Sequence, residues 1–436
     1  MFRKTTGRPT LDAWLAEYRA IEEEFVCARE SEGVAFEPYG VGLTRVVDLR
    51  RMLRERGARF MNGGASISSG FLSSACEACV GDCGSRTFYI NLRCNRDCYF
   101  CFNPNQIDFE EHCLRDTPWR EDLEAFARSG VAVTHIGLTG GEPLLVRDEA
   151  LAFFRCAREL CPDAHLRLYT SGLGLDEAFC REAAACGLDE IRFSVKLDEG
   201  ESSVAKTLAG IRIARRCIPD VMVEMPVAPD EGERMERLLV ELDEAGVRGV
   251  NLLEFCYPFR NWNEFSRRGY RVKNPPFEVL YEYGYAGGLP IAGSEEACLE
   301  LVLFALDEGL RIGVQYCSLD NKNRDQVLQA NRSVALDPAL YELGGDCFYH
   351  AAKAFDGDVG VARRVLSERH AFFTEDDEGC VTFHPRFAAE VAAAGVAVAH
   401  SWNIVERQSG AAVVRELKLA LWDEEGVGRP WSARLS

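Results

Sequence analysis

The sequence predicts an α/β fold built around a partial (β/α)6-type parallel barrel with a candidate seventh strand. An N-terminal helical extension precedes this barrel and a small C-terminal α+β unit follows it. The prediction depends on the alternation of short apolar runs and amphipathic segments that begins at residue 87. Strand and helix patterns that alternate at this spacing are typical of βαβ units in a parallel sheet. The alternation ends after residue 340, which indicates a separate unit.

Seven segments carry the strand pattern, and amphipathic helix patterns lie between them. They are TFYINLR (87–93), HIGLTG (135–140), HLRLYTSG (165–172), EIRFSVK (190–196), VMVEMPVAP (221–229), GVNLLEF (249–255) and RIGVQYCS (311–318). The sixth strand is followed by an aromatic, Pro-containing insertion at about 256–290, which is expected either to cap a site or to form local core.

The expected organisation has four parts. They are a helical extension (1–75), a cysteine segment (76–86), the core barrel (87–318) and a helical and α+β unit (319–436). Within the extension, NGGASISSG (62–70) is rich in Gly and Ser and is expected to be flexible.

Composition narrows the classes of function. The formal net charge is −19, which disfavours binding to bulk nucleic acid or to an anionic membrane. The N-terminus has no apolar signal region, and no stretch reaches the roughly 18 apolar residues of a membrane span. A cytoplasmic location is therefore expected, and in that reducing compartment the 18 cysteines are not interpreted as disulfides.

Three cysteines crowd into RCNRDCYFCFNP (93–104), directly after the first strand. Cys94, Cys98 and Cys101 have C-x3-C-x2-C spacing, so one loop can place three thiolates around a metal centre. Iron–sulfur clusters are normally held by four thiolates, and three would leave one iron open. Zinc and an accidental group of core thiols are the alternatives.

The motif C-N-R-D-C-Y-F-C resembles the C-x3-C-x-aromatic-C signature of the radical S-adenosylmethionine (SAM) superfamily. Phe100 stands at the aromatic position, which the resemblance places beside the adenine. A second motif, Gly140-Gly141-Glu142-Pro143, follows the second strand and is similar to the Gly-Gly-Glu-Pro segment of the same superfamily. Read alone, those four residues would indicate only a tight turn.

The resemblance implies a function and further site residues. The expected cofactors are SAM and a [4Fe–4S] cluster on Cys94, Cys98 and Cys101, with Glu142 receiving the methionine ammonium. Ser194 and Lys196, at the end of the fourth strand, are expected to contact ribose or carboxylate. A 5′-deoxyadenosyl radical would then abstract hydrogen from a peptide or small metabolite, after electron delivery by a flavodoxin- or ferredoxin-type donor.

A second cysteine group, Cys76, Cys79 and Cys83, precedes the first strand with C-x2-C-x3-C spacing. We expect an auxiliary [4Fe–4S] cluster there, and zinc or no metal are the alternatives. The candidate fourth ligands are Cys317, which we favour, Cys256 and Cys113. Such a cluster would bind substrate if one iron is open and carry an electron if all are ligated.

Other classes of function remain open at this point. Within the superfamily, tRNA modification is disfavoured by the acidic composition, and activation of a glycyl-radical enzyme would not need the extra cysteine group. The non-enzymatic alternative is a cysteine-rich zinc- or cluster-binding interaction protein. Lys322, Arg324 and Asp325 follow the seventh strand and are expected either to bind an anionic substrate group or to begin a solvated helix.

Overall fold

The computed structural model describes residues 5–283, 288–377, 379–408 and 410–422. Its large sheet has nine strands in the order β1-β2-β11-β8-β7-β6-β5-β4-β3. All neighbours from β11 to β3 pair in parallel, whereas β2 joins β11 and β1 joins β2 in antiparallel pairs. The parallel strands are β3 (Ser85–Tyr89), β4 (His135–Thr139), β5 (His165–Thr170), β6 (Glu190–Phe193), β7 (Asp220–Val227), β8 (Gly249–Glu254) and β11 (Gly313–Cys317).

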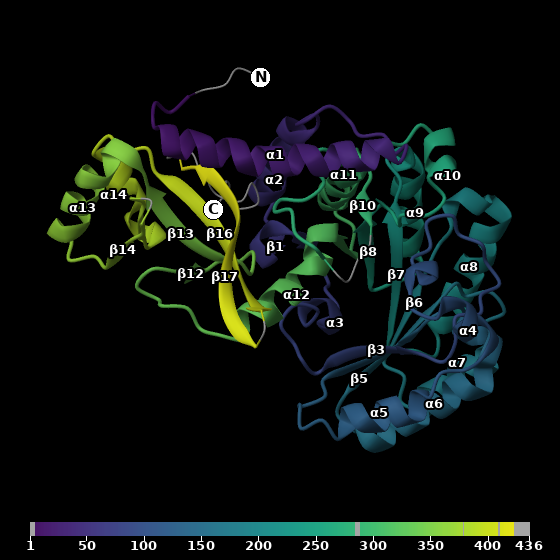
Figure 1. Cartoon of the computed structure of the whole chain (residues 1–436). Helices are drawn as coiled ribbons and strands as arrows, with labels where there is room; N and C mark the ends of the chain where they lie inside the picture. Colours follow the sequence, from purple (N-terminus) through teal and green to yellow (C-terminus); the bar gives the residue numbers. More distant parts are fainter. Residues whose placement is uncertain (1–4, 284–287, 378, 409, 423–436) are drawn as a thin grey trace.

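Helices connect these strands and cover the outer face of the sheet (Figure 1). They are α5 (Trp119–Ala127), α6 (Arg147–Leu160), α7 (Glu177–Ala185), α8 (Glu201–Ala214), α9 (Gly232–Glu244) and α11 (Ser294–Asp307). Their apolar faces and the outward-facing strand residues form the main core, which is typical of a βαβ fold. Among the described residues no pairing joins β1 to β3, so the sheet remains open. The predicted partial parallel barrel with a seventh strand is thus confirmed.

The prediction that residues 62–70 form a flexible stretch is wrong. Strand β2 (Ser66–Ser69) lies within this stretch and is entirely buried, and it pairs with both β11 and β1 (Arg59–Met61). Without β2, the outer edge of β11 would leave buried N–H and C=O groups unpaired, which is costly. The small side chains of Ser66 and Ser68 fit the crowded interior of the sheet.

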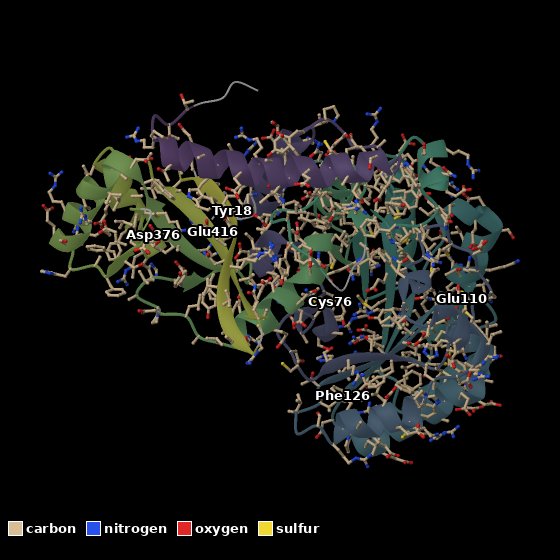
Figure 2. All side chains as sticks on the ribbon, in the orientation of Figure 1. Tyr18, Cys76, Glu110, Phe126, Asp376 and Glu416 are labelled. Carbon is tan, nitrogen blue, oxygen red and sulfur yellow. The ribbon has the colours of Figure 1, made fainter. Side chains whose placement is uncertain are left out.

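The N-terminal helices α1 (Pro9–Ser31) and α2 (Leu43–Glu55) were predicted as helical patterns and are present. Helix α1 extends along the molecule and contacts the C-terminal sheet (Figure 1). There the hydroxyl of Tyr18 donates to Glu416 at 2.9 Å (Figure 2). Among the described residues, no helix is long and apolar enough to cross a membrane.

The insertion after β8 contains β9 (Cys256–Tyr257), α10 (Trp262–Arg267) and β10 (Leu289–Pro290), and residues 284–287 lie outside the described part. Its aromatic side chains form a second core cluster in which Phe265 is fully buried. Helix α12 (Leu319–Arg332) follows β11 and lies between the large sheet and the C-terminal unit (Figure 1).

The C-terminal unit is an antiparallel sheet in the order β14-β15-β13-β16-β17, with β12 beside β13. The strands are β12 (Glu342–Leu343), β13 (Tyr349–Ala354), β14 (Phe373–Glu375), β15 (Val381–Phe383), β16 (Ala399–Gln408) and β17 (Ala411–Leu421). Helices α13 (Val359–Glu368) and α14 (Ala388–Ala393) share a separate apolar core with it. The α+β character predicted for this region is therefore present.

Candidate active site at the carboxyl ends of the parallel strands

The first cysteine loop begins where β3 ends, at the carboxyl edge of the sheet. Its three thiols lie close enough to act on one another electrostatically, and the N–H of Cys101 donates to the carbonyl of Cys98 at 3.0 Å. Cys94 is exposed, whereas Cys98 and Cys101 are half-buried. Burial raises the pKa of both the Cys94 and Cys101 thiols. The loop therefore gathers three thiols at one partly open place on the surface.

The Gly-Gly-Glu-Pro segment follows β4 and lies directly against this loop. Its backbone N–H groups at Gly141 and Glu142 donate to the carbonyls of Asn91 and Arg93 at 3.1 and 2.7 Å. A Cβ atom at Gly141 would lie 1.8 Å from the Arg93 carbonyl oxygen. Glycine is therefore required here for close approach between two backbone segments.

This contact predicts the effect of a single methyl group at the junction. Gly141→Ala should displace the cysteine loop and remove about four irons per chain, the content of one [4Fe–4S] cluster. Gly360→Ala on α13 is the matched control, because its added Cβ would meet nothing within 4 Å. Iron analysis after anaerobic reconstitution checks this, and an unchanged iron content in the Gly141 variant would contradict it.

Glu142 is buried, and its carboxylate accepts four hydrogen bonds. One oxygen accepts from the N–H of Leu144 and the hydroxyl of Thr170, and the other from the N–H and hydroxyl of Ser171. A carboxylate offers about four lone-pair sites, so these partners saturate it. Glu142 therefore joins its own turn, which continues through buried Pro143, to the Tyr-Thr-Ser-Gly turn after β5.

Phe100 faces a cavity of about 230 Å³ at the ends of β6, β7 and β8. Its ring packs against Tyr99 and Phe255, with centroid distances of 5.0 and 5.5 Å. The ammonium of Lys196 lies 4.8 Å from the centroid of the Phe100 ring and its charge also acts on Cys101. The hydroxyl of Ser194 donates to the Glu224 carbonyl at 3.1 Å.

Four polar residues of this cavity were not predicted from the sequence as site residues: Asp198, Asp230, Glu231 and Arg268. Tyr270 also lines it and comes from the aromatic insertion that was expected to cap a site or form local core. The hydroxyl of Tyr270 donates to Asp230 at 2.8 Å, and burial raises the pKa of Glu231 to about 6. Tyr270 and Arg268 belong to the insertion, and Asp230 and Glu231 directly follow the fifth predicted strand. For Asp230 and Glu231, the signal in the sequence that could have identified them is their position directly after a predicted strand.

Two cysteines of the second group, Cys76 and Cys79, interact with Cys317 in the structure. Cys76 lies on α3 (Ser74–Glu77), beside the strands of the large sheet (Figure 2), and interacts with Cys79 and Cys317. The amide nitrogen of Asn321 lies 3.7 Å from the Cys79 sulfur and 3.3 Å from the Cys317 sulfur. Burial raises the pKa of Cys79 to about 11 and that of Cys317 to about 12.

The remaining candidate thiols have other surroundings. Cys83 is exposed and its thiol contacts the side-chain oxygen of Gln329 at 3.5 Å. Cys113 contacts the Leu92 carbonyl at 3.5 Å, and Cys256 is buried on β9. The structure thus brings Cys317 near Cys76 and Cys79, and Cys83 contacts Gln329 of α12.

The three charged residues after β11 also separate. Arg324 is buried and donates to the carboxylate of Glu278 at 2.9 Å and to the Asp346 carbonyl at 2.5 Å, so it stabilises the junction with the C-terminal unit. Asp325 accepts from the N–H of Gly81 at 2.7 Å. Lys322 lies 6.0 Å from the centroid of Phe102, and its charge acts on Cys317. Of the three, it is Lys322 that lies between the two cysteine groups.

The three thiols of the first group fit iron–sulfur chemistry by their donor atoms. A cluster spreads its thiolates over several irons, and thiolates are its ordinary ligands. Cys94, Cys98 and Cys101 therefore suit a cluster.

Comparison with known proteins agrees with this site. Residues 88–242 match the family model described as the radical SAM superfamily. A relative from Methanocaldococcus jannaschii, named "Putative glycyl-radical enzyme activating enzyme", is 27% identical over 53% of this chain and 60% of its own. A PqqA peptide cyclase from Methylocella silvestris is 31% identical over 27% of this chain and 30% of its own. The chain thus spans at most 60% of the length of these two relatives.

A solved structure described as native anSMEcpe with bound AdoMet and Cp18Cys peptide is also similar. It shares 13% identity over 52% of this chain and 62% of its own, with a TM-score of 0.36.

The chain carries a radical SAM domain, in which the cysteine loop and the Gly-Gly-Glu-Pro segment both fall. This domain is similar to the radical SAM superfamily over residues 88–242, and the relatives named above differ in the activities that their names state.

Proposed function

We propose that this enzyme cleaves SAM reductively at a [4Fe–4S] cluster held by Cys94, Cys98 and Cys101 and abstracts hydrogen from a peptide or small-molecule substrate. The observation that carries the proposal is the joint placement of three thiols and an aromatic-lined cavity at the carboxyl edge of the parallel strands. Catalytic residues of parallel barrels lie at this edge.

The cofactor pair, when bound, supplies one-electron cleavage of the sulfonium bond and a 5′-deoxyadenosyl radical. The protein's part is to bind, orient and exclude water. Phe100 offers its ring to the adenine, and the carboxylate of Glu231 is a candidate acceptor for hydroxyl or amino groups. Lys196, beside Phe100 and Cys101, suits the methionine carboxylate.

The ammonium group needs an acceptor other than the Glu142 side chain, because four protein donors already saturate that carboxylate. We assign Glu142 the role of a positioning residue. It holds the Gly-Gly-Glu-Pro turn against the turn after β5. The backbone N–H groups of the Gly-Gly-Glu-Pro turn donate to the segment that leads into the cysteine loop and so hold that loop.

The reaction needs an electron from outside the chain, and we propose a small flavodoxin- or ferredoxin-type donor. Cys94 is exposed, so the first site reaches the surface, where such a donor can approach. Away from this surface, Lys322 lies between the two cysteine groups and suits an anionic group of the substrate. A cytoplasmic location fits the use of free thiols as ligands.

The test is reductive cleavage itself. Anaerobically reconstituted protein, incubated with dithionite and SAM, should release 5′-deoxyadenosine and methionine in equal amounts. Protein that carries a full cluster and releases neither product would overturn the proposal.

The Phe100 ring gives a separate prediction. Phe100→Ala should weaken SAM binding by about tenfold, since a ring–ring contact contributes roughly 0.5–1.5 kcal/mol. The iron content should not change, because Phe100 supplies no ligand. Equilibrium dialysis with labelled SAM measures the affinity, and Phe372→Ala, at a half-exposed ring of the C-terminal unit, is the control.

The similarity to a relative named as a glycyl-radical enzyme activating enzyme favours a second candidate function. In that case the substrate would be a protein glycine, and the product a stable glycyl radical. Electron paramagnetic resonance of the protein mixed with a candidate partner separates the two functions, because a small-molecule or peptide reaction leaves no persistent glycyl signal on a partner protein.

A further inference from the structure

We propose that Cys76, Cys79 and Cys317 hold a second iron–sulfur cluster and that Cys83 is not one of its ligands. This inference rests on the proposed function and deepens it by assigning a second metal site at Cys76, Cys79 and Cys317, which we call the inner site. It depends on the positions of two buried thiols, Cys76 and Cys317, and one exposed thiol, Cys79, on the donors near them and on the contact that Cys83 makes elsewhere.

The three cysteines come from two segments that are fixed independently, one with Cys76 and Cys79 and one with Cys317. Cys317 ends β11, which is paired on both sides by β8 and β2. Cys76 lies on α3, whose N-cap residue Ser73 accepts from the N–H of Ala75 and donates to Glu190 of β6. Strand β11 and one capped turn therefore hold Cys317 and Cys76 in place before any metal binds.

A single amide joins Cys79 to Cys317. Asn321 lies on the first turn of α12, and its side-chain nitrogen is 3.7 Å from the Cys79 sulfur and 3.3 Å from the Cys317 sulfur. These two sulfurs are therefore at most 7.0 Å apart. Asn62 donates to the amide oxygen of Asn321 at 2.8 Å, which fixes the amide with its N–H groups toward the sulfurs.

A buried cation faces Cys76. The guanidinium of Arg192 is 3% exposed and its charge acts on Cys76, while it donates to Ser73 at 3.0 Å and pairs with the carboxylates of Glu190 and Glu224. Hydrogen bonds and positive charge at cluster sulfurs stabilise the reduced state. Arg192 and Asn321 thus place a cation beside Cys76 and an amide donor beside Cys79 and Cys317, and the carboxylates of Glu190 and Glu224 offset part of the positive charge.

Cys83 contacts a part of α12 that is distant from Asn321. Its thiol contacts Gln329, which is eight residues after Asn321 and so about 12 Å further along the helix axis at 1.5 Å per residue. The spacing in sequence therefore does not define the ligand set. Three thiolates would leave one iron of the inner cluster without a protein thiolate, in the region bordered by Lys322.

The inner site is tested in protein that lacks the first one. A Cys94→Ala/Cys98→Ala/Cys101→Ala variant should still bind about four irons per chain after reconstitution. Adding Cys76→Ala, Cys79→Ala or Cys317→Ala should remove them, and adding Cys83→Ala should not. Iron and sulfide analysis and electron paramagnetic resonance give the readout. Loss of iron in the Cys83 variant, zinc in place of iron, or no iron before the extra substitutions would overturn the proposal.

A second measurement does not require removal of any ligand. Asn321→Ala should shift the midpoint potential of the inner cluster to a more negative value, because two sulfurs lose a hydrogen-bond donor. Asn323→Ala, two residues further along α12, is the control, since neither polar atom of that side chain has a hydrogen-bond partner. An unchanged potential in the Asn321 variant would overturn the assignment. Neither experiment uses SAM, so failure here is distinct from failure of the proposed function.

Discussion

Cys98→Ala is expected to abolish formation of 5′-deoxyadenosine and to remove about four irons per chain. The sulfur of Cys98 lies at the centre of the loop and interacts with both Cys94 and Cys101. Two thiolates would not hold a [4Fe–4S] cluster, so the loss should be complete rather than partial. Iron analysis and chromatographic detection of 5′-deoxyadenosine provide the measurement.

The matched control for this prediction is Cys113→Ala. Cys113 is a half-buried thiol that follows the same loop, and it contacts the carbonyl of Leu92 instead of another thiol. It should retain both iron and activity. The interpretation of the loop as the SAM-cleaving site would be contradicted by a Cys98 variant that keeps its iron and cleaves SAM at the wild-type rate.

Glu142→Ala is expected to lower the free energy of unfolding by about 3–5 kcal/mol. The substitution leaves four buried donors without an acceptor, and hydrogen bonds to charged groups contribute about 1.5–3 kcal/mol each, with incomplete additivity. It also separates the Gly-Gly-Glu-Pro turn from the turn after β5. Urea unfolding of the reduced apoprotein, followed by circular dichroism, measures the change.

Glu149→Ala, at an exposed position on α6, is the control and should change the free energy of unfolding by no more than about 0.5 kcal/mol. This pair of variants also distinguishes two roles for Glu142. If Glu142→Ala kept wild-type stability and lost only SAM affinity, Glu142 would be a direct ligand of the cofactor and the positioning role would be wrong.

Much of the fold could be predicted because its signals are local. Apolar strands and amphipathic helices alternate over residues 87 to 318, and each of the seven predicted strands is present in the parallel sheet. The two motifs follow the first two of those strands, so their meeting at one edge follows from parallel topology. The aromatic at position 100 and the cavity beside it belong to the same edge.

The parts that were not predicted depend on contacts between distant segments. The strand Ser66–Ser69 has few apolar residues, and it is a strand because the edge of β11 needs a partner. Glu142 is saturated by a turn about 30 residues away, which its own motif cannot reveal. Cys83 fits the cysteine spacing of its group, and its contact with Gln329 of α12, on which we base its exclusion from the proposed ligand set, is one that the spacing does not reveal.

The most direct test of the central claim compares two variants that each lack one set of thiols. Protein with Cys76, Cys79 and Cys317 replaced by alanine should still release 5′-deoxyadenosine from SAM with dithionite. Protein with Cys94, Cys98 and Cys101 replaced should release none. Equal release by both variants, or release only by the second, would contradict the claim that the loop after β3 is the working site.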